Sequence, residues 1–405
     1  MSAPAPEGAA PREVSAAERP TLAAGLRLAV YSDTWLPQVN GVTRTLDRLV
    51  TAVRARGGEA RAYTTTDPGA DADADVVRYR ARAFPLYPQL QVARPDKAWA
   101  VRELEQYRPT LVHAATPFGI GLSGRSAALA RQVPFVTSYH TSLSAYAKFY
   151  HLGFAAAPGW AFLRWFHNSG RRTFCPTRAI QQELVDHAFT GMRIWSRGID
   201  AQRFSPTFRS AALRAELGLS EDTFLVTYIG RIALEKGLDT LVKGMHEVVT
   251  RAGERKIAFA LAGDGPYEAA CRRDAPPGTH FVGMLSGDRL SSFYASGDLF
   301  VFPSVTDTFG NVLLEAMASG LPILGADSGP TRELLDGGRG AIFPEAAATR
   351  MATDVLALAD DPARRDRMRG AGLAYARARS WDAIFDALVL DYRDAVADPS
   401  HGPRR

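Results

Sequence analysis

Residues 306–316 combine two carboxylates with a glycine in a pattern suited to holding a phosphorylated ligand. They follow the apolar run Leu299–Phe302 and predict a strand, a polar loop and the start of a helix. Gly310 lets the backbone approach a ligand closely, and the free N–H groups at a helix start attract a phosphate. Asp307 precedes the turn, and Glu315 lies one helical turn beyond Asn311. Both carboxylates can therefore face one crevice at the carboxyl end of a parallel sheet.

The spacing of Asp307 and Glu315, with seven residues between them that include Phe309-Gly310, resembles the motif of the retaining glycosyltransferases of family 4. The resemblance covers nearly the whole chain from Leu26 to Tyr392. It includes three further segments, which are specific only in combination: GRIALEKG at 230–237, GDGP at 263–266 and ASGLP at 318–322. It implies an α/β protein of the GT-B fold, in which two facing Rossmann-like, doubly wound domains hold a nucleotide sugar mainly with the second domain.

The same resemblance implies roles for charged residues. Arg231 and Lys236 are expected on the donor diphosphate, where two fixed cations offset the charge of the departing nucleotide. Glu315 is expected to bind the ribose hydroxyls. Asp307 stands where the family usually has a glutamate that holds hydroxyls of the transferred sugar, and this variant is similar to the mannosyl- and sulfoquinovosyl-transferring branches. The other donor contacts implied are Gly41, Gly263, Met284, Phe309, Gly310 and Asn311.

Two segments of the first half predict the acceptor side of the site. Residues 35–42 link the first strand to the first helix and resemble the family's glycine-containing loop, so Asn40 and Gly41 are expected beside both substrates. Tyr139 and His140 follow another strand, and His140 resembles the family histidine that lies beside the transferred sugar. The expected catalytic group is His140, Asp307, Arg231 and Lys236.

Each of these residues also has a structural interpretation. Glu315 can be a solvated helix carboxylate, Arg231 and Lys236 an exposed pair, and Gly41 a glycine at a helix start. A lone histidine is more often structural than functional. The joint spacing of the charged residues favours the functional interpretation.

Other ligand classes find little support in the sequence. The acidic repeat Asp71-Ala72-Asp73-Ala74-Asp75 superficially matches a metal motif of the other large glycosyltransferase architecture, but it has no preceding apolar strand and reads as a solvated loop. We therefore expect no metal site and no cofactor, with the nucleotide sugar as co-substrate. The phosphate-loop motif is absent, as is a dinucleotide motif after the first strand, and no basic run interleaved with aromatic residues indicates nucleic-acid binding.

The predicted elements place these residues on two domains. Short apolar runs alternate with amphipathic segments, and the clearest helix runs from about Val42 to Arg56. Strands are expected at 26–31, 60–64, 111–115, 135–139 and 173–176 in the first domain, and at 224–229, 257–262, 280–282, 299–302 and 322–324 in the second. We expect a disordered tail at 1–21, domains at 22–200 and 201–380, a C-terminal helix at 381–397 that docks on the first domain, and a tail at 398–405.

Composition sets limits on location. The chain has 405 residues, 46% hydrophobic and 22% charged, with a net charge of +5 and no run long enough to span a bilayer, so we expect a cytoplasmic protein. Cys175 and Cys271 are isolated and predict neither a disulfide nor a zinc site. Residues 143–166 are rich in aromatic side chains with nearby arginines. This segment fits either peripheral contact with the inner face of the cell membrane or ordinary core packing.

The function expected from the sequence is transfer of a hexose, with retention, from a nucleoside-diphosphate sugar to a hydroxyl of a lipid or saccharide acceptor. Similarity to the branch favours GDP-mannose as the donor. A UDP-sugar donor (UDP-sulfoquinovose, UDP-glucose or UDP-galactose) and a nucleotide-sugar epimerase of the same fold remain alternatives. A non-catalytic sensor of nucleotide sugars is opposed by the intact set of charged residues.

Overall fold

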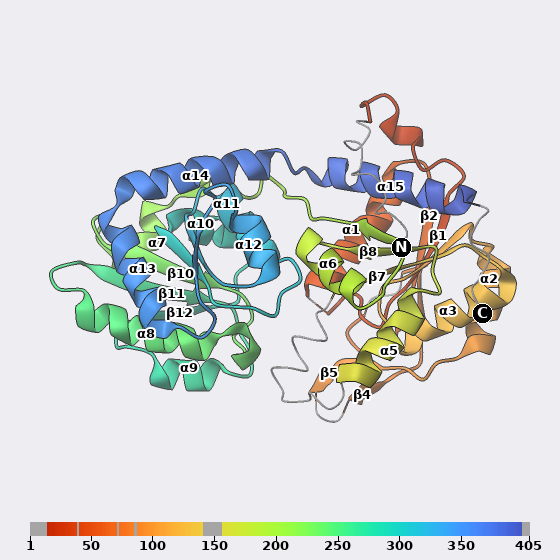
Figure 1. The fold of residues 1–405 in the computed structure, drawn as a ribbon, viewed down its shortest axis with the longest axis horizontal. Helices are drawn as coiled ribbons and strands as arrows, with labels where there is room; N and C mark the ends of the chain where they lie inside the picture. The colour runs from red at the N-terminus through yellow and green to blue at the C-terminus, as the bar shows by residue number, and fades with distance from the viewer. Residues whose placement is uncertain (1–13, 39, 71–72, 85–86, 141–155, 399–405) are drawn as a thin grey trace.

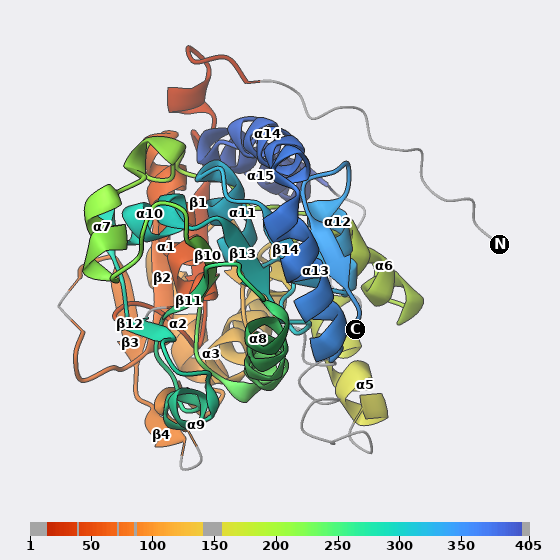
Figure 2. The same cartoon turned by 90° about the vertical axis from the view of Figure 1, so that its left-hand side faces the viewer.

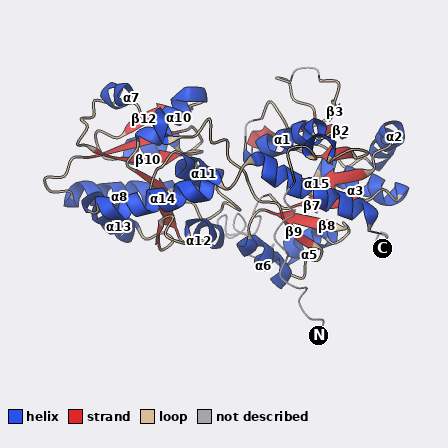
Figure 3. Cartoon of the chain, turned by 90° about the horizontal axis from the view of Figure 1, so that it is seen from above, coloured by secondary structure: helices blue, strands red, loops and turns tan. Residues whose placement is uncertain are grey.

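The computed structural model describes residues 14–38, 40–70, 73–84, 87–140 and 156–398, and they form two α/β domains (Figure 1). In each domain helices cover both faces of one parallel sheet, as the view from above shows (Figure 3). Continuous apolar strands such as Leu299–Phe302 are buried on both faces, which is the pattern that such a layered sheet requires. The predicted pair of doubly wound domains is confirmed.

The first sheet has seven parallel strands in the order β3-β2-β1-β6-β7-β8-β9. Its strands are β1 (Arg27–Tyr31), β2 (Glu59–Thr65), β3 (Val76–Tyr79), β6 (Leu111–Ala114), β7 (Phe135–Ser138), β8 (Arg172–Cys175) and β9 (Met192–Ile194). Its helices are α1 (Gly41–Ala55), α2 (Lys97–Tyr107), α3 (Gly119–Arg131), α5 (Ala156–His167) and α6 (Arg178–Asp186). A separate antiparallel hairpin joins β4 (Arg82–Phe84) to β5 (Tyr87–Val92).

The second sheet has six parallel strands in the order β12-β11-β10-β13-β14-β15. They are β10 (Phe224–Ile229), β11 (Ile257–Ala262), β12 (His280–Gly283), β13 (Leu299–Phe302), β14 (Ile323–Ala326) and β15 (Ala341–Phe343). The helices are α7 (Ala211–Glu216), α8 (Leu238–Arg251), α9 (Glu268–Asp274), α10 (Gly287–Ser296), α11 (Asn311–Ala318), α12 (Gly329–Leu335), α13 (Ala348–Asp360) and α14 (Pro362–Arg377). Figure 2 shows α10 and α11 on one side of this sheet and α8 on the other. In both sheets the strand order reverses beside the first strand, where doubly wound folds bind ligands.

Two segments connect the domains and lie side by side. Ile199 donates its N–H to Arg379 O at 2.8 Å and forms a parallel bridge with Ser380. After this crossing, α15 (Trp381–Ala397) leaves the second domain and runs along the first (Figure 1). Its buried Phe385 and Tyr392 join the core that contains Leu46 of α1. The C-terminal helix therefore docks on the first domain, through the apolar face that its sequence pattern predicts.

The predicted disordered tail is wrong for residues 14–21, whereas residues 1–13 and 399–405 lie outside the described part of the chain. A 3₁₀ turn at Arg19–Thr21 packs near α15, and Arg19 Nε donates to Asp386 Oδ2 at 2.9 Å. Arg56, at the end of α1, donates to the other oxygen of Asp386 at 2.7 Å. This contact spans the length of the sequence, so local composition gives no sign of it.

The carboxyl group of Asp391 on α15 should make the free energy of unfolding depend on pH. Burial raises the pKa of Asp391 to about 6 despite Arg193, whose Nε lies 3.7 Å away. Because the folded pKa exceeds the ordinary value near 4, the folded chain binds the proton more tightly, and stability falls as pH rises from about 4 through about 6. Asp391→Asn should therefore raise the free energy of unfolding by about 1–2 kcal/mol at about pH 8 and hardly at about pH 4.

Thermal melting of both proteins across this pH range tests the effect. Asp288→Asn, at an exposed position of α10, is the control for a change from aspartate to asparagine without burial. An equal gain at both pH values would show that burial of a charged Asp391 is not the cause.

Candidate active site

The loop between β13 and α11 carries Asp307 and contacts the first domain through Thr308, while Glu315 lies on α11 itself. Gly310 has a φ of +80°, and a Cβ there would lie 3.2 Å from side-chain carbons of Leu313 and Phe302. Glycine is therefore favoured where the chain turns to begin α11. Phe309 is buried in the second-domain core and anchors the loop, so its side chain is a packing residue.

Asp307 is held by two donors. Lys236 Nζ lies 2.8 Å from Asp307 Oδ1 and 2.9 Å from Oδ2, and Ser304 Oγ donates to Oδ2 at 2.6 Å. Burial alone would raise the pKa of Asp307, but the Lys236 ion pair and the Ser304 hydrogen bond outweigh it and lower this pKa. The structure thus joins two residues that lie far apart in sequence into one charged pair.

Arg231 and Gly263 follow the ends of the neighbouring strands β10 and β11. Arg231 Nη1 lies 3.4 Å from Glu235 Oε1, and the Arg231 side chain is 38% exposed. Gly263 has a φ of +136°, and a Cβ there would lie 1.9 Å from Gly230 O, so only glycine fits. Met284 follows β12 and is exposed. Arg231, Lys236, Gly263 and Met284 thus lie at the carboxyl ends of three adjacent strands.

Glu315 lies within a cluster that the sequence only partly predicts. Its Oε2 accepts a hydrogen bond from Tyr294 Oη at 2.8 Å. Burial raises the pKa of Glu315, while that bond and the positive charges of Arg44, Arg203 and Arg48 oppose the rise. Tyr294 and these arginines were missed in the sequence. The only signal was Arg44 and Arg48 one helical turn apart, just after the Gly41 loop.

The first-domain loop meets the donor side at Gly41. Gly41 is the first residue of α1, and a Cβ there would lie 3.4 Å from Asn311 Nδ2 of the second domain. Asn40 caps α1, since its Oδ1 accepts from Thr43 N at 2.9 Å, and its Nδ2 donates to Thr34 Oγ1. Gly41 and Asn311 thus face each other across the domains, whereas the Asn40 side chain is used by the helix start.

His140 lies against the donor loop, whereas Tyr139 does not. Thr308 Oγ1 donates to His140 O at 2.8 Å. Burial and the charge of Arg197 lower the pKa of His140 well below its usual value, so its ring is neutral. Tyr139 is buried in a core cluster with Leu163, since successive residues of an extended chain face opposite sides. The expectation that the Tyr139 side chain lies on the acceptor side is therefore not met.

No metal site is evident among the described residues, where no three His, Cys, Asp or Glu side chains are grouped suitably. In the acidic repeat, Asp75 pairs with Arg54 at 2.9 Å and Asp73 accepts from Asp75 N. Asp71 and Ala72 lie outside the described residues. No helix in the described ranges is both long and apolar enough to cross a membrane.

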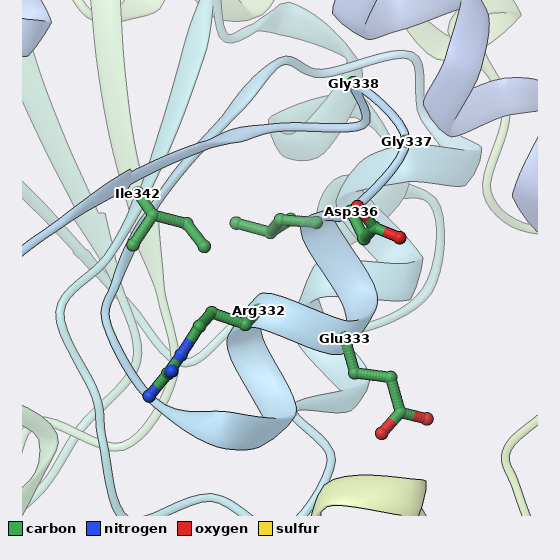
Figure 4. A pocket seen from close by; sticks show the side chains of 7 residues that line it. Arg332, Glu333, Asp336, Gly337, Gly338 and Ile342 are labelled. Carbon is green, nitrogen blue, oxygen red and sulfur yellow. The ribbon is translucent and has the colours of Figure 1, made fainter.

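A surface depression of about 470 Å³ lies over the end of α12 (Figure 4). Its polar side chains serve the fold: Arg332 pairs with Asp327 at 2.7 Å, and Glu333 accepts from Ala179 N of the first domain at 2.9 Å. None of the predicted site residues lines it. The depression is therefore separate from the group around Asp307.

Comparisons with known proteins agree with this arrangement. Residues 39–203 match the model of Glycosyltransferase Family 4, and residues 223–361 match that of Glycosyl transferases group 1. A GDP-mannose-dependent alpha-mannosyltransferase of Corynebacterium glutamicum is 31% identical over 92% of this chain and 90% of its own length. The sulfoquinovosyl transferase SQD2 of Arabidopsis thaliana is 30% identical over 85% of this chain and 69% of its own.

Solved structures share the fold. A sucrose-phosphate synthase of Thermosynechococcus elongatus aligns with a TM-score of 0.73 at 21% identity, covering 92% of this chain and 99% of that one. The Anabaena protein HepE in complex with UDP-glucose also aligns with a TM-score of 0.73, at 18% identity, covering 91% and 100%. These likenesses identify the two-domain arrangement as GT-B. With the site motifs and the extent of the sequence match, the chain belongs to glycosyltransferase family 4 and is a transferase enzyme.

Proposed function

We propose that this enzyme transfers mannose from GDP-mannose to a hydroxyl of a membrane lipid or glycolipid, with retention of configuration. The observation that carries the proposal is the position of four charged residues, Arg231 and Lys236 after β10 and Asp307 and Glu315 after β13. The segment that holds Asp307 and Glu315 also contacts Gly41 through Asn311 and His140 through Thr308. Relatives named as GDP-mannose-dependent alpha-mannosyltransferases in three organisms, at 29–31% identity, support the donor.

The geometry suits departure of a nucleoside diphosphate. Lys236 and Arg231, with the start of α11, would stabilise negative charge as the bond between the sugar C1 and the phosphate oxygen breaks. The acceptor oxygen forms its bond to C1, and its proton goes to the departing phosphate. Asp307 would hold sugar hydroxyls and Glu315 the ribose. Because these cations are built into the fold, we propose that no added metal ion is essential.

A lipid acceptor is supported by the exposed face of α5. Pro158, Ala161, Phe162 and Trp165 are exposed on it at helical spacing, and Arg125 stacks on Trp165 at 3.8 Å. An apolar face with basic side chains fits an interface with anionic lipid. An alpha-monoglucosyldiacylglycerol synthase of Streptococcus pneumoniae is 26% identical over 74% of this chain. We therefore propose a cytoplasmic location with peripheral membrane contact. The described residues of the aromatic segment do not include Tyr146, Phe149, Tyr150 and Phe154.

A panel of GDP-, UDP- and ADP-sugars tests the donor. A ligand that binds only the folded chain raises its melting temperature, and GDP-mannose should do so selectively, by an amount that disappears in Glu315→Ala. Lys243→Met, an exposed change in the same domain, should keep the response. A selective rise with UDP-sulfoquinovose or another UDP-sugar would refute GDP-mannose and favour the second candidate, which the similarity to SQD2 supports.

A further inference from the structure

A chain of hydrogen bonds runs from the C-terminal helix to His140. Tyr392 Oη lies 2.6 Å from His113 Nδ1, and His113 Nε2 lies 2.8 Å from Ser138 Oγ. Ser138 Oγ then lies 2.7 Å from His140 Nε2, and Arg197 Nη2 lies 3.1 Å from His140 Nδ1. Tyr392, His113, Ser138 and Arg197 are all buried. Residues from four parts of the fold are thus linked in one set of hydrogen bonds, in which Ser138 and Arg197 contact the His140 ring directly.

The hydrogen bond from Arg197 determines which ring nitrogen of His140 carries the proton. A guanidinium only donates hydrogen bonds, so Nδ1 of His140 must accept and carries no hydrogen. The neutral ring therefore bears its proton on Nε2, which donates to Ser138 Oγ. In either of its own tautomers, His113 bonds Ser138 on one side and Tyr392 on the other. If Nδ1 of His140 carried the proton instead, two hydrogen-bond donors would face each other between His140 and Arg197.

The surroundings keep the two histidines of this set of hydrogen bonds uncharged. Burial lowers the pKa of His113 to about 3, and burial with the nearby Arg197 lowers that of His140. Arg197 itself is fixed by donating to Trp195 O at 2.7 Å. A proton-transfer role for His140 is opposed, because the protein engages both ring nitrogens.

The main chain of His140 extends the link across the domains. Thr308 Oγ1 donates to His140 O at 2.8 Å, and Thr177 Oγ1 donates to Thr308 O at 3.3 Å. Thr308 is the residue after Asp307. The orientation of His140 is thus connected to the loop that carries the Lys236–Asp307 pair.

We propose that Arg197 and Ser138, backed by His113 and Tyr392, are positioning residues that hold His140 in one neutral tautomer and one orientation beside the donor loop. The kinetic part of this proposal rests on the proposed transferase function. It makes α15 part of the active site's support, through the bond of Tyr392 to His113.

Nitrogen-15 NMR of the histidine-labelled full chain tests the tautomer without any donor. His140, assigned with a His140→Gln sample, should show a bare Nδ1 and a protonated Nε2 throughout about pH 5 to 8. A protonated Nδ1, or titration of the ring in this range, would overturn the proposal. This result does not depend on the identity of the substrate.

Steady-state kinetics test whether Ser138 and Tyr392 hold His140 in position. Tyr392→Phe and Ser138→Ala should each lower kcat roughly tenfold, because a small displacement of a site group is costly, while the donor Kd changes less than about twofold. The matched control is Tyr31→Phe, a buried tyrosine whose Oη has no hydrogen-bond partner among the described residues. Equal kcat in Tyr392→Phe, Ser138→Ala and the control would refute the positioning role. Absence of transfer by the wild type with every nucleotide sugar would instead refute the proposed function.

Discussion

Replacing Lys236 by methionine is expected to lower kcat/KM for sugar transfer by a factor of about 10³ while the protein stays folded. Methionine keeps the length of the side chain but removes the cation 2.8 Å from Asp307. The departing diphosphate then loses a fixed positive charge, and the carboxylate of Asp307 loses its partner. Steady-state release of nucleotide in the presence of acceptor measures the effect.

Lys243→Met is the matched control for this change. Lys243 lies on α8 of the same domain, and its side chain is 72% exposed in a weak pair with Asp239. Its replacement should leave kcat/KM within about twofold, since exposed pairs contribute little. If Lys236→Met retained wild-type kcat/KM, the assignment of Lys236 to the donor diphosphate would be wrong.

Replacing Asp386 by alanine is expected to lower the free energy of unfolding of the first domain by about 3–5 kcal/mol. Asp386 is buried and accepts from both Arg56 and Arg19, so its loss leaves the buried Arg56 guanidinium without its main countercharge. The change should also loosen α15 from α1 and release residues 14–21 from the first domain. Denaturant unfolding followed by tryptophan fluorescence, with hydrogen exchange of α15, measures both effects.

Asp382→Ala distinguishes the loss of a buried carboxylate from the loss of an exposed carboxylate with the same charge. Asp382 lies one turn earlier on α15 and also pairs with Arg56, at 3.0 Å, but its side chain is 61% exposed. We expect it to cost less than about 1 kcal/mol. Equal losses in the two variants would contradict the view that the buried Asp386 holds the C-terminal helix and the N-terminal turn together.

The sequence predicted most of the strands because buried parallel strands are continuous apolar runs. It missed the edge strands β3, β9 and β15, which are only three or four residues long and too short to give a pattern, and the β4–β5 hairpin. Residues 14–21 looked disordered because they lack large apolar side chains. They fold through Arg19 and a carboxylate 367 residues away, which no local pattern can reveal.

The candidate site was predictable where one segment carries its motif. Asp307, Gly310 and Glu315 lie on a single loop and helix, as their segment predicts. That the two carboxylates face one crevice stays a prediction. The surroundings of His140 were not predictable, because the hydrogen bonds that lead to it join residues of β6, β7, the segment after β9 and α15. Asn40 was assigned to the acceptor side, but its side chain caps α1. Asparagine is favoured at helix starts, so the residue type alone does not distinguish a capping role from contact with a substrate.

The most direct test of the account is transfer itself. Purified enzyme would be incubated with GDP-mannose and a detergent-dispersed polar lipid extract, without added divalent metal, and the lipids examined by mass spectrometry and the new linkage by NMR. The account predicts a lipid that has gained one hexose in α linkage, no such product with Lys236→Met, and little effect of a metal chelator. Hexose addition from a UDP-sugar alone, strict dependence on a divalent metal, or a β-linked product would contradict it.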